Sequence, residues 1–153
     1  MKAARTIRRQ RGLALVETAI TLPLLLFVML AASEFTFAFV QHTTLTKAAR
    51  DGVRYVAEEA IDGSLTVNLT QQLIDETRRL VVYGDRDQTS GTPLVSGLTV
   101  NDVSVLDAGG DNLEVRVNYA HTGILGSVLP TFGYGSDISL LFNMTASVTM
   151  RAL

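Results

Sequence analysis

A long apolar run near the N-terminus dominates the hydrophobic pattern of the chain. Residues 13–32 read LALVETAITLPLLLFVMLAA and contain one charged side chain, that of Glu17. As a helix this run would be about 30 Å long, which matches the hydrocarbon core of a bilayer. Its eleven Leu, Ile, Val and Phe residues favour insertion by roughly 3–7 kcal/mol in total, whereas an acid at the bilayer centre costs roughly 3 kcal/mol. The pattern therefore predicts a transmembrane helix.

Two other interpretations of this run are open from the sequence. A buried core helix is the weaker one, because the run is long and apolar on all sides. A cleaved secretory signal fits the basic start and the small residues Ala31, Ala32 and Ser33 after the run. Against it, Leu30 stands where a cut after Ala32 needs a small residue, and the run is longer than a usual signal. A retained helix is the interpretation that we favour.

After the run, apolar positions recur at spacings of three and four, which is the period of a helix. These positions are Leu45, Ala49, Val53, Val56 and Ala60. The helix is therefore predicted to continue from Leu13 to about Ile61, where Asp62-Gly63 would end it. The stripe is expected to pack on the protein's own sheet, and packing in a bundle of several subunits is the alternative.

A second helix and three strands are predicted in the rest of the chain. Asn68 with Gln71 resembles a capping box, and Gly84 is placed to end the helix that it starts. Strands with a period of two are predicted at 98–106, 113–119 and 138–150, and a hairpin turn joins the first two. The apolar face of the last strand is expected to hold Ile138, Leu140, Phe142, Met144, Ala146, Val148 and Met150.

These elements predict an α+β fold. Three antiparallel strands with one apolar face need a cover, and the outer half of the long helix and the second helix can supply it. We therefore expect a long N-terminal transmembrane helix and a second helix packed on a small antiparallel sheet of about three strands. Residues 122–135, which contain GILGSVLPTFGYG, are apolar and rich in Gly. They are expected to form a short helix or loop that closes the core, with a subunit contact as the alternative.

The charge distribution sets an orientation for the membrane helix. Five of the thirteen Lys and Arg residues lie in the first twelve positions, together with none of the fifteen acids. By the positive-inside rule, this start stays in the cytoplasm and the rest of the chain lies outside. The remainder has eight basic residues against fifteen acidic ones, a net charge of −7. An acidic body argues against nucleic-acid binding, which needs clustered Lys and Arg.

The sequence contains no recognisable catalytic or cofactor site. Without Cys the chain has no disulfide, thiol nucleophile or Cys-type zinc site. His42 and His121 lie far apart, and neither has a second ligand at a metal-binding spacing. A phosphate-binding Gly-rich loop, a HExxH motif and a nucleophile elbow are all missing from the sequence. We expect a protein that is not an enzyme and that holds no cofactor or metal.

Glu17 and Pro23 are unusual inside a membrane helix and indicate a function. Gly12, directly before the run, is a small residue at the cytoplasmic face. If a peptidase cut after Gly12, Leu13 would become the N-terminus and Glu17 the fifth residue. The free α-amino group could then pair with the Glu17 carboxylate of a neighbouring subunit, which would offset the cost of burying both charges. Pro23 removes one backbone donor and is expected to bend the helix.

A basic leader, a Gly and an apolar helix with Glu at its fifth position together resemble the prepilins of type IV-like pili. The sequence RGLALVETAITLPLLLF followed by TKAARDGVRYVAEEA is most similar to the TadE-like pseudopilins. These are minor pilins of the tight-adherence, or Flp-type (type IVb-like), pilus system. The resemblance covers about the first sixty residues. Thr18 departs from it, because the family commonly has an aromatic residue after the Glu.

The resemblance implies a structural or assembly component of a Flp-type pilus that supports adherence and biofilm formation. It implies prepilin cleavage between Gly12 and Leu13, and roles for Glu17 and Pro23 in subunit assembly. The implied partners are membrane lipid, a prepilin peptidase, other pilins or pseudopilins and an inner-membrane assembly platform. The implied location is the bacterial inner membrane, crossed once, with a cytoplasmic N-terminus and a periplasmic C-terminal domain; an extracellular pilus is the alternative.

The expected organisation is a leader at 1–12, a transmembrane and extended helix at 13–62 and an extracytoplasmic pilin-like α+β domain at 63–153. Two other classes of function stay open. One is an uncleaved, single-pass binding module of the envelope, and the other is a secreted soluble domain or small hydrolase freed near Ala32. The mature N-terminus separates the three, because it would lie at Leu13, at Met1 or near Ser33 respectively.

Overall fold

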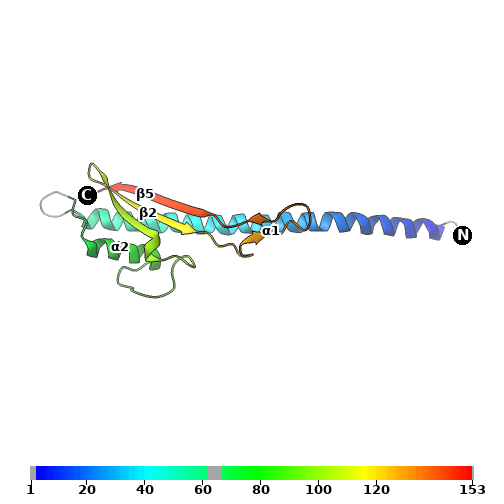
Figure 1. Ribbon diagram of the computed structural model, residues 1–153, viewed down its shortest axis with the longest axis horizontal. Coiled ribbons are helices and arrows are strands. Elements are labelled where there is room, and N and C mark those ends of the chain that lie inside the picture. The colour runs from blue at the N-terminus through cyan, green and yellow to red at the C-terminus, as the bar shows by residue number, and fades with distance from the viewer. Residues whose placement is uncertain (1–2, 62–66, 153) are drawn as a thin grey trace. The chain divides into compact units, whose positions relative to one another are not determined.

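The computed structural model describes residues 3–61 and 67–152, with side chains from residue 12 onward (Figure 1). The chain divides into two compact units. We call the first the anchor unit; it contains the chain up to Phe37 together with Thr122–Leu141. We call the second the body unit; it contains Ala38–His121 and the chain from Phe142 onward.

Helix α1 runs from Ala3 to Glu59 and contributes to both units. It begins earlier than the predicted Leu13, because the leader is rich in Ala, Arg and Gln, which are good helix formers. Pro23 lies inside the helix, which continues past it. The predicted stop at Asp62-Gly63 lies outside the described residues.

Helix α2 runs from Gln71 to Tyr83, as the apolar spacing predicted. Its first turn is capped by Thr70, whose hydroxyl oxygen accepts a hydrogen bond from the backbone N–H of Leu73 at 3.3 Å. The prediction that Asn68 is the cap was therefore wrong by two residues. Gly84 ends the helix as predicted, in the left-handed conformation with φ of 77°, which glycine adopts without steric cost.

Replacing Thr70 by Ala is expected to destabilise the body unit by about 1 kcal/mol, the usual cost of losing an N-cap. Asn68→Ala is the matched control, because Asn68 is an exposed residue of the same segment whose side chain does not cap the helix. Thermal unfolding of the full chain in detergent measures both. Equal losses of stability in the two variants would show that the Thr70 hydroxyl does not cap α2.

The main sheet has three antiparallel strands in the order β1-β2-β5. Strand β1 is Val103–Gly109, β2 is Asn112–Ala120 and β5 is Asn143–Arg151. The first strand begins at Val103, five residues later than predicted, because Val100–Asp102 form a 3₁₀ turn (η1). In this turn the Asp102 carboxylate accepts hydrogen bonds from the backbone N–H and the hydroxyl of Thr99, the N-cap residue. The turn between β1 and β2 holds Gly109, Gly110 and Asp111 at positive φ, so it is tight, as the Gly-rich sequence indicated.

The core of the body unit is built as predicted. All five positions of the predicted apolar stripe, four on α1 and Ala60 directly after it, are at most 1 % exposed. They join α2 and the inward-facing residues of the sheet in one cluster, which shows that the stripe packs on the protein's own sheet. Members from the other elements are Leu73, Val81, Val82, Val103, Leu113, Val115, Val117, Met144 and Ala146. The fold is therefore α+β, with α1 and α2 on the apolar face of a small antiparallel sheet (Figure 1).

The predicted strand at 138–150 is divided in the structure. Only its second half forms β5, where Met144 and Ala146 face the core. Ile138–Ser139 form the short strand β4, which pairs with β3 at Val128–Leu129. Ile138 and Phe142 are 47 % exposed, so they do not belong to the buried face to which the alternating pattern assigned them.

Candidate assembly and membrane site

Helix α1 is long and apolar enough to cross a membrane. From Gly12 to Glu59 it contains an 18-residue window with a mean hydropathy of 2.3, and none of that window is buried by the rest of the protein. Leu13 and Met29 are each 72 % exposed. An apolar surface of this kind is stable in lipid and unfavourable in water, because about 25 cal/mol is lost for each Å² of apolar area left in water.

The four predicted site residues all lie on α1. Gly12 and Leu13 are exposed, and a Cβ added at Gly12 would have no neighbouring atom within 4 Å. Glu17 is exposed one turn further along, about 6 Å up the helix axis from Leu13. Pro23 is partly covered. The structure brings these residues together only by their spacing on one helix, so cleavage and subunit pairing stay predictions.

The polar side chains of the apolar run bond to the helix itself. The hydroxyl of Thr18 donates to the carbonyl oxygen of Ala14 at 2.8 Å, and that of Thr21 donates to the carbonyl oxygen of Glu17 at 2.6 Å. Such bonds remove the cost of placing a hydroxyl in hydrocarbon. Thr18, which departs from the family pattern, is therefore compatible with a membrane helix.

The turn of α1 before Pro23 has a hydrogen-bond donor that the sequence did not indicate. A proline has no N–H, so the carbonyl four residues earlier, that of Ala19, loses its helical donor. The next carbonyl, that of Ile20, accepts a hydrogen bond from the hydroxyl of Tyr134 at 3.0 Å. Tyr134 therefore supplies a donor to the turn of α1 that the proline weakens.

Glu34 is the second acid of the anchor unit, and sequence reasoning missed its role. Its side chain is only 4 % exposed. One carboxylate oxygen accepts from the backbone N–H of Leu125 at 2.6 Å, and the other accepts from that of Ile124 at 3.2 Å. Gly123 is required beside it, because a Cβ there would lie 2.7 Å from the Glu34 carboxylate. An acid just after the apolar run was the available signal in the sequence.

The apolar segment between β2 and β5 belongs to the anchor unit. Residues 122–141 form a hairpin in which β3 pairs with β4, and we call them the apolar hairpin. The Asp137 carboxylate accepts from the backbone N–H of Thr131 at 3.1 Å, and the Thr131 hydroxyl donates to the carbonyl of Gly135 at 2.7 Å. Most of residues 122–135 is loop and turn, as predicted, with the short strand β3 within it. The segment packs on α1 in the anchor unit, so it does not close the core of the body unit.

A buried polar cluster lies at the edge of the body unit. The Nδ1 atom of His121 lies 2.6 Å from the amide oxygen of Gln41, and the amide nitrogen of Gln41 lies 3.4 Å from the hydroxyl of Tyr119. That hydroxyl donates to the carbonyl of Ser96 at 2.7 Å. The ring of His121 packs on that of Phe142, with centroids 4.6 Å apart. These bonds satisfy buried polar atoms and fix the ends of the strands, which is a structural role.

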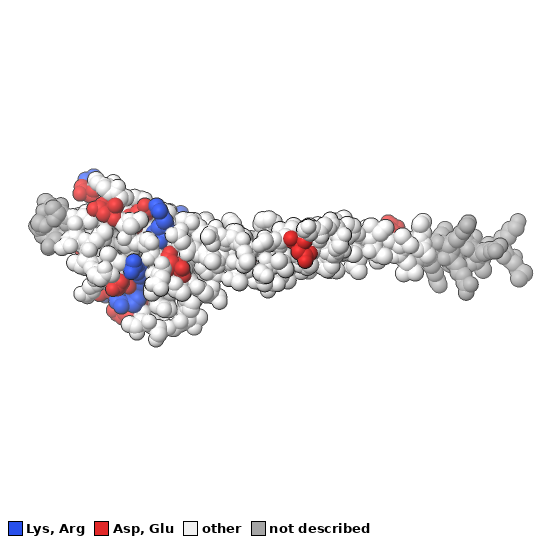
Figure 2. All heavy atoms as spheres, in the orientation of Figure 1, with Lys and Arg blue, Asp and Glu red and all other residues white. Residues whose placement is uncertain are grey.

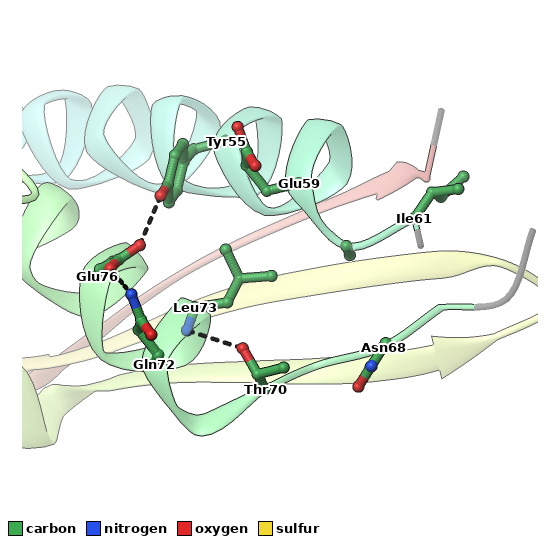
Figure 3. Close-up of a pocket in the computed structure, with 9 residues that line it drawn as sticks. Tyr55, Glu59, Ile61, Asn68, Thr70, Gln72, Leu73 and Glu76 are labelled. Atoms are coloured by element: carbon green, nitrogen blue, oxygen red, sulfur yellow. Dashed lines mark hydrogen bonds between the residues drawn. The ribbon is translucent and has the colours of Figure 1, made fainter. Parts of the chain in front are cut away.

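A polar pocket of about 390 Å³ lies between the ends of α1 and α2 (Figure 3). Glu76 points from α2 toward Tyr55 of α1, whose hydroxyl donates to its carboxylate at 2.7 Å. Hydrogen bonds from Gln72 and Tyr55 lower the pKa of Glu76, and desolvation followed by the bond to Glu76 raises the pKa of Tyr55. Glu76 is therefore a link between the two helices.

The charges of the molecule concentrate in the body unit and the leader. Figure 2 shows the blue and red atoms gathered over the sheet and α2, with few red atoms and no blue ones visible on the white part of the elongated end. In the anchor unit beyond the leader the sequence contains Glu17, Glu34 and Asp137 as its charged residues. In the part of the chain that the structure describes, no three His, Asp or Glu side chains come together as metal ligands.

Comparison with known proteins finds one similarity, which lies in the N-terminal part of the chain. The family model for TadE-like proteins matches residues 12–54. The match begins at Gly12, includes Glu17, Pro23 and Glu34, and ends within the core stripe of α1. No curated protein sequence and no solved structure gives a significant match to the chain. The chain is therefore similar to TadE-like proteins over the apolar run of α1 and the helical segment that follows it.

Proposed function

We propose that this protein is a minor pilin, or pseudopilin, of a Flp-type (tight-adherence) pilus, and that it acts in pilus assembly and not as an enzyme. The observation that carries the proposal is the match to the TadE-like family over residues 12–54. That range contains Gly12, Glu17 and Pro23 on one exposed apolar helix. A protein with this helix supports assembly through contacts in the membrane.

In the proposed mechanism a prepilin peptidase cuts after Gly12, which is exposed on α1. The α-amino group of Leu13 then becomes a cation at one end of the apolar run. It pairs with the Glu17 carboxylate of an adjacent pilin, which is exposed and free to meet a partner. The pair neutralises two charges that would each be unfavourable in lipid. Pro23 shapes the helix for packing against its neighbours.

The proposed partners are membrane lipid, the prepilin peptidase, other pilins or pseudopilins and the inner-membrane assembly platform. The basic leader supports a cytoplasmic N-terminus and a body unit on the periplasmic side. Such a subunit contributes to adherence and biofilm formation through the pilus that it helps to build. Positions in the fibre, at its tip or in the membrane as an initiator all agree with this role.

The mature N-terminus tests the proposal. Mass spectrometry of protein from native membranes is expected to find Leu13 as the first residue, and to find the uncut chain in a strain without prepilin peptidase. Gly12→Val is expected to block cleavage in the wild-type strain, because it places a branched side chain at the cut, where Gly has none. A start at Met1 in every strain would indicate an uncleaved anchored module. A start near Ser33 would indicate a secreted domain and would remove the membrane mechanism.

A further inference from the structure

The apolar hairpin packs on the part of α1 that is suited to lipid. The hydroxyl of Tyr134 bonds to the backbone of Ile20, and an apolar groove of about 320 Å³ lies between helix and hairpin. The groove is lined on one side by Leu24 and Phe27 of α1, and on the other by hairpin residues that include Ile138. All of these residues belong to the anchor unit.

The contacts between the hairpin and α1 lie within the apolar run, on the N-terminal side of its last residue, Ala32. With a rise of 1.5 Å per residue, Phe27, Leu24 and Ile20 lie roughly 8, 12 and 18 Å along the helix axis from Ala32. If residues 13–32 span the hydrocarbon core, a segment that touches these three residues also lies beneath the membrane surface. Glu34, which holds the start of the hairpin, lies just beyond the run, where the interface begins.

The composition of the hairpin fits a position beneath the membrane surface. Its twenty residues, 122–141, contain one charged residue, Asp137, and no Lys or Arg. Within the hairpin Leu129 is buried, whereas six other large apolar side chains are 40–62 % exposed. They are Ile124, Leu125, Val128, Phe132, Ile138 and Leu141. A set of apolar side chains exposed next to an apolar helix needs the same non-aqueous surroundings as the helix.

Part of the backbone of the hairpin has hydrogen-bond partners within the anchor unit. An N–H group in lipid costs several kcal/mol unless it has a partner. Here β3 pairs with β4, the Glu34 carboxylate accepts two N–H groups, and the Asp137 carboxylate accepts a third. The acids that look misplaced in an apolar unit therefore serve as acceptors for its backbone.

We propose that the apolar hairpin is a second membrane-embedded element, which enters the bilayer leaflet on the side of the body unit and lies against α1 there. Lipid covers its exposed side chains, and acyl chains fill the groove beside Leu24 and Phe27. Lipid is the expected occupant because the hairpin contacts a helix segment that lies at the same depth in the hydrocarbon. The inference depends on insertion of α1, and not on cleavage or pilus assembly.

Tryptophan fluorescence tests the inference, because the chain contains no Trp and each single-Trp variant reports one position. The full chain is reconstituted in phosphatidylcholine–phosphatidylglycerol vesicles with or without brominated acyl chains. Phe132→Trp reports the hairpin. Leu25→Trp, on the exposed face of α1, reports helix insertion, and Thr149→Trp, on the exposed face of β5, reports the aqueous side. Acrylamide serves as the quencher from water.

The expected result is that brominated lipid quenches Phe132→Trp to an extent close to Leu25→Trp, whereas acrylamide quenches only Thr149→Trp strongly. Acrylamide quenching of Phe132→Trp like that of Thr149→Trp would place the hairpin in water and overturn the inference. Protection of Phe132→Trp from both quenchers would show that protein, such as a second copy, covers it, which also overturns the inference. Failure of lipid to quench Leu25→Trp would mean that α1 itself does not insert, and the inference would fall with it.

Discussion

Replacing Glu17 by Gln is expected to abolish surface pili while the protein still inserts in the membrane. The substitution keeps the size of the side chain and removes the charge that the neighbouring α-amino group needs. Without that partner, the N-terminal cation stays unpaired in lipid, which costs several kcal/mol and opposes incorporation of the subunit. Electron microscopy of pili and immunoblots of membrane fractions measure the two effects in a strain that has this chain as its only copy.

Glu59→Gln is the matched control for this experiment. Glu59 is an exposed acid near the end of the same helix, in the body unit and far from the apolar run. Its loss is expected to leave piliation unchanged. Normal pili in the Glu17→Gln strain would contradict the proposed role of Glu17, and a loss of pili in both strains would show that the effect is not specific to the membrane acid.

Replacing Gly52 by Ala is expected to destabilise the body unit by about 2 kcal/mol. Gly52 is where α1 approaches α2, and a Cβ there would overlap Cγ2 of the fully buried Val81. Overpacking of a core usually costs about 1–3 kcal/mol, and the gain of about 1 kcal/mol from replacing a helical Gly does not compensate for a contact this short. Thermal or urea unfolding of the full chain in detergent measures the loss.

A double variant separates overpacking from other causes. Val81→Ala removes the clashing methyl group, after which the closest remaining atoms to a Cβ at Gly52 are on Thr77 and Val115, at 3.5 and 3.7 Å. These are ordinary contact distances, so Gly52→Ala with Val81→Ala is expected to be more stable than the sum of the two single changes predicts. Strict additivity would mean that the two helices do not meet at these residues.

The body unit could be predicted largely from the sequence because its pattern and its burial agree. Val53 and Val56 lie on the helical stripe, and Val115 and Val117 alternate along β2; all four are fully buried. In each case the local period of apolar residues is the same as the period of the face that meets the core. Burial of apolar area dominates there, so the pattern alone was sufficient.

The apolar hairpin could not be predicted, because long-range contacts decide its place. The alternation of Ile138, Leu140 and Phe142 is the same as that of β5, and it suggested one continuous strand. The two segments differ in their partners, because Ile138–Ser139 pair with β3 whereas β5 pairs with β2, and such pairing leaves no local pattern. The N-cap of α2 is a smaller case, since Asn68 and Thr70 both suit the role and only the geometry selects Thr70.

The roles of the candidate site residues were predicted from sequence spacing and not from burial. Gly12, Glu17 and Pro23 were identified from their spacing, and the family match begins at the first of them. The roles proposed for Gly12 and Glu17 involve other molecules, a peptidase and a neighbouring subunit. Their exposure on α1 is compatible with those roles, and the experiments on the mature N-terminus and on Glu17 decide them.

The stripe on α1 is synthesised long before the strand that completes its cover. Leu45 and Val53 emerge early from the ribosome, whereas Met144 and Ala146 come from β5, near the far end of the described chain. Contacts between segments so distant in sequence form slowly, because the chain between them must first be ordered. The nascent chain therefore passes through a state in which an apolar helix face is bare, and such states associate readily. The preceding helix tethers each chain to a membrane, so these intermediates move only in the membrane plane and stay near lipid. In this way the anchor also protects the body while it folds.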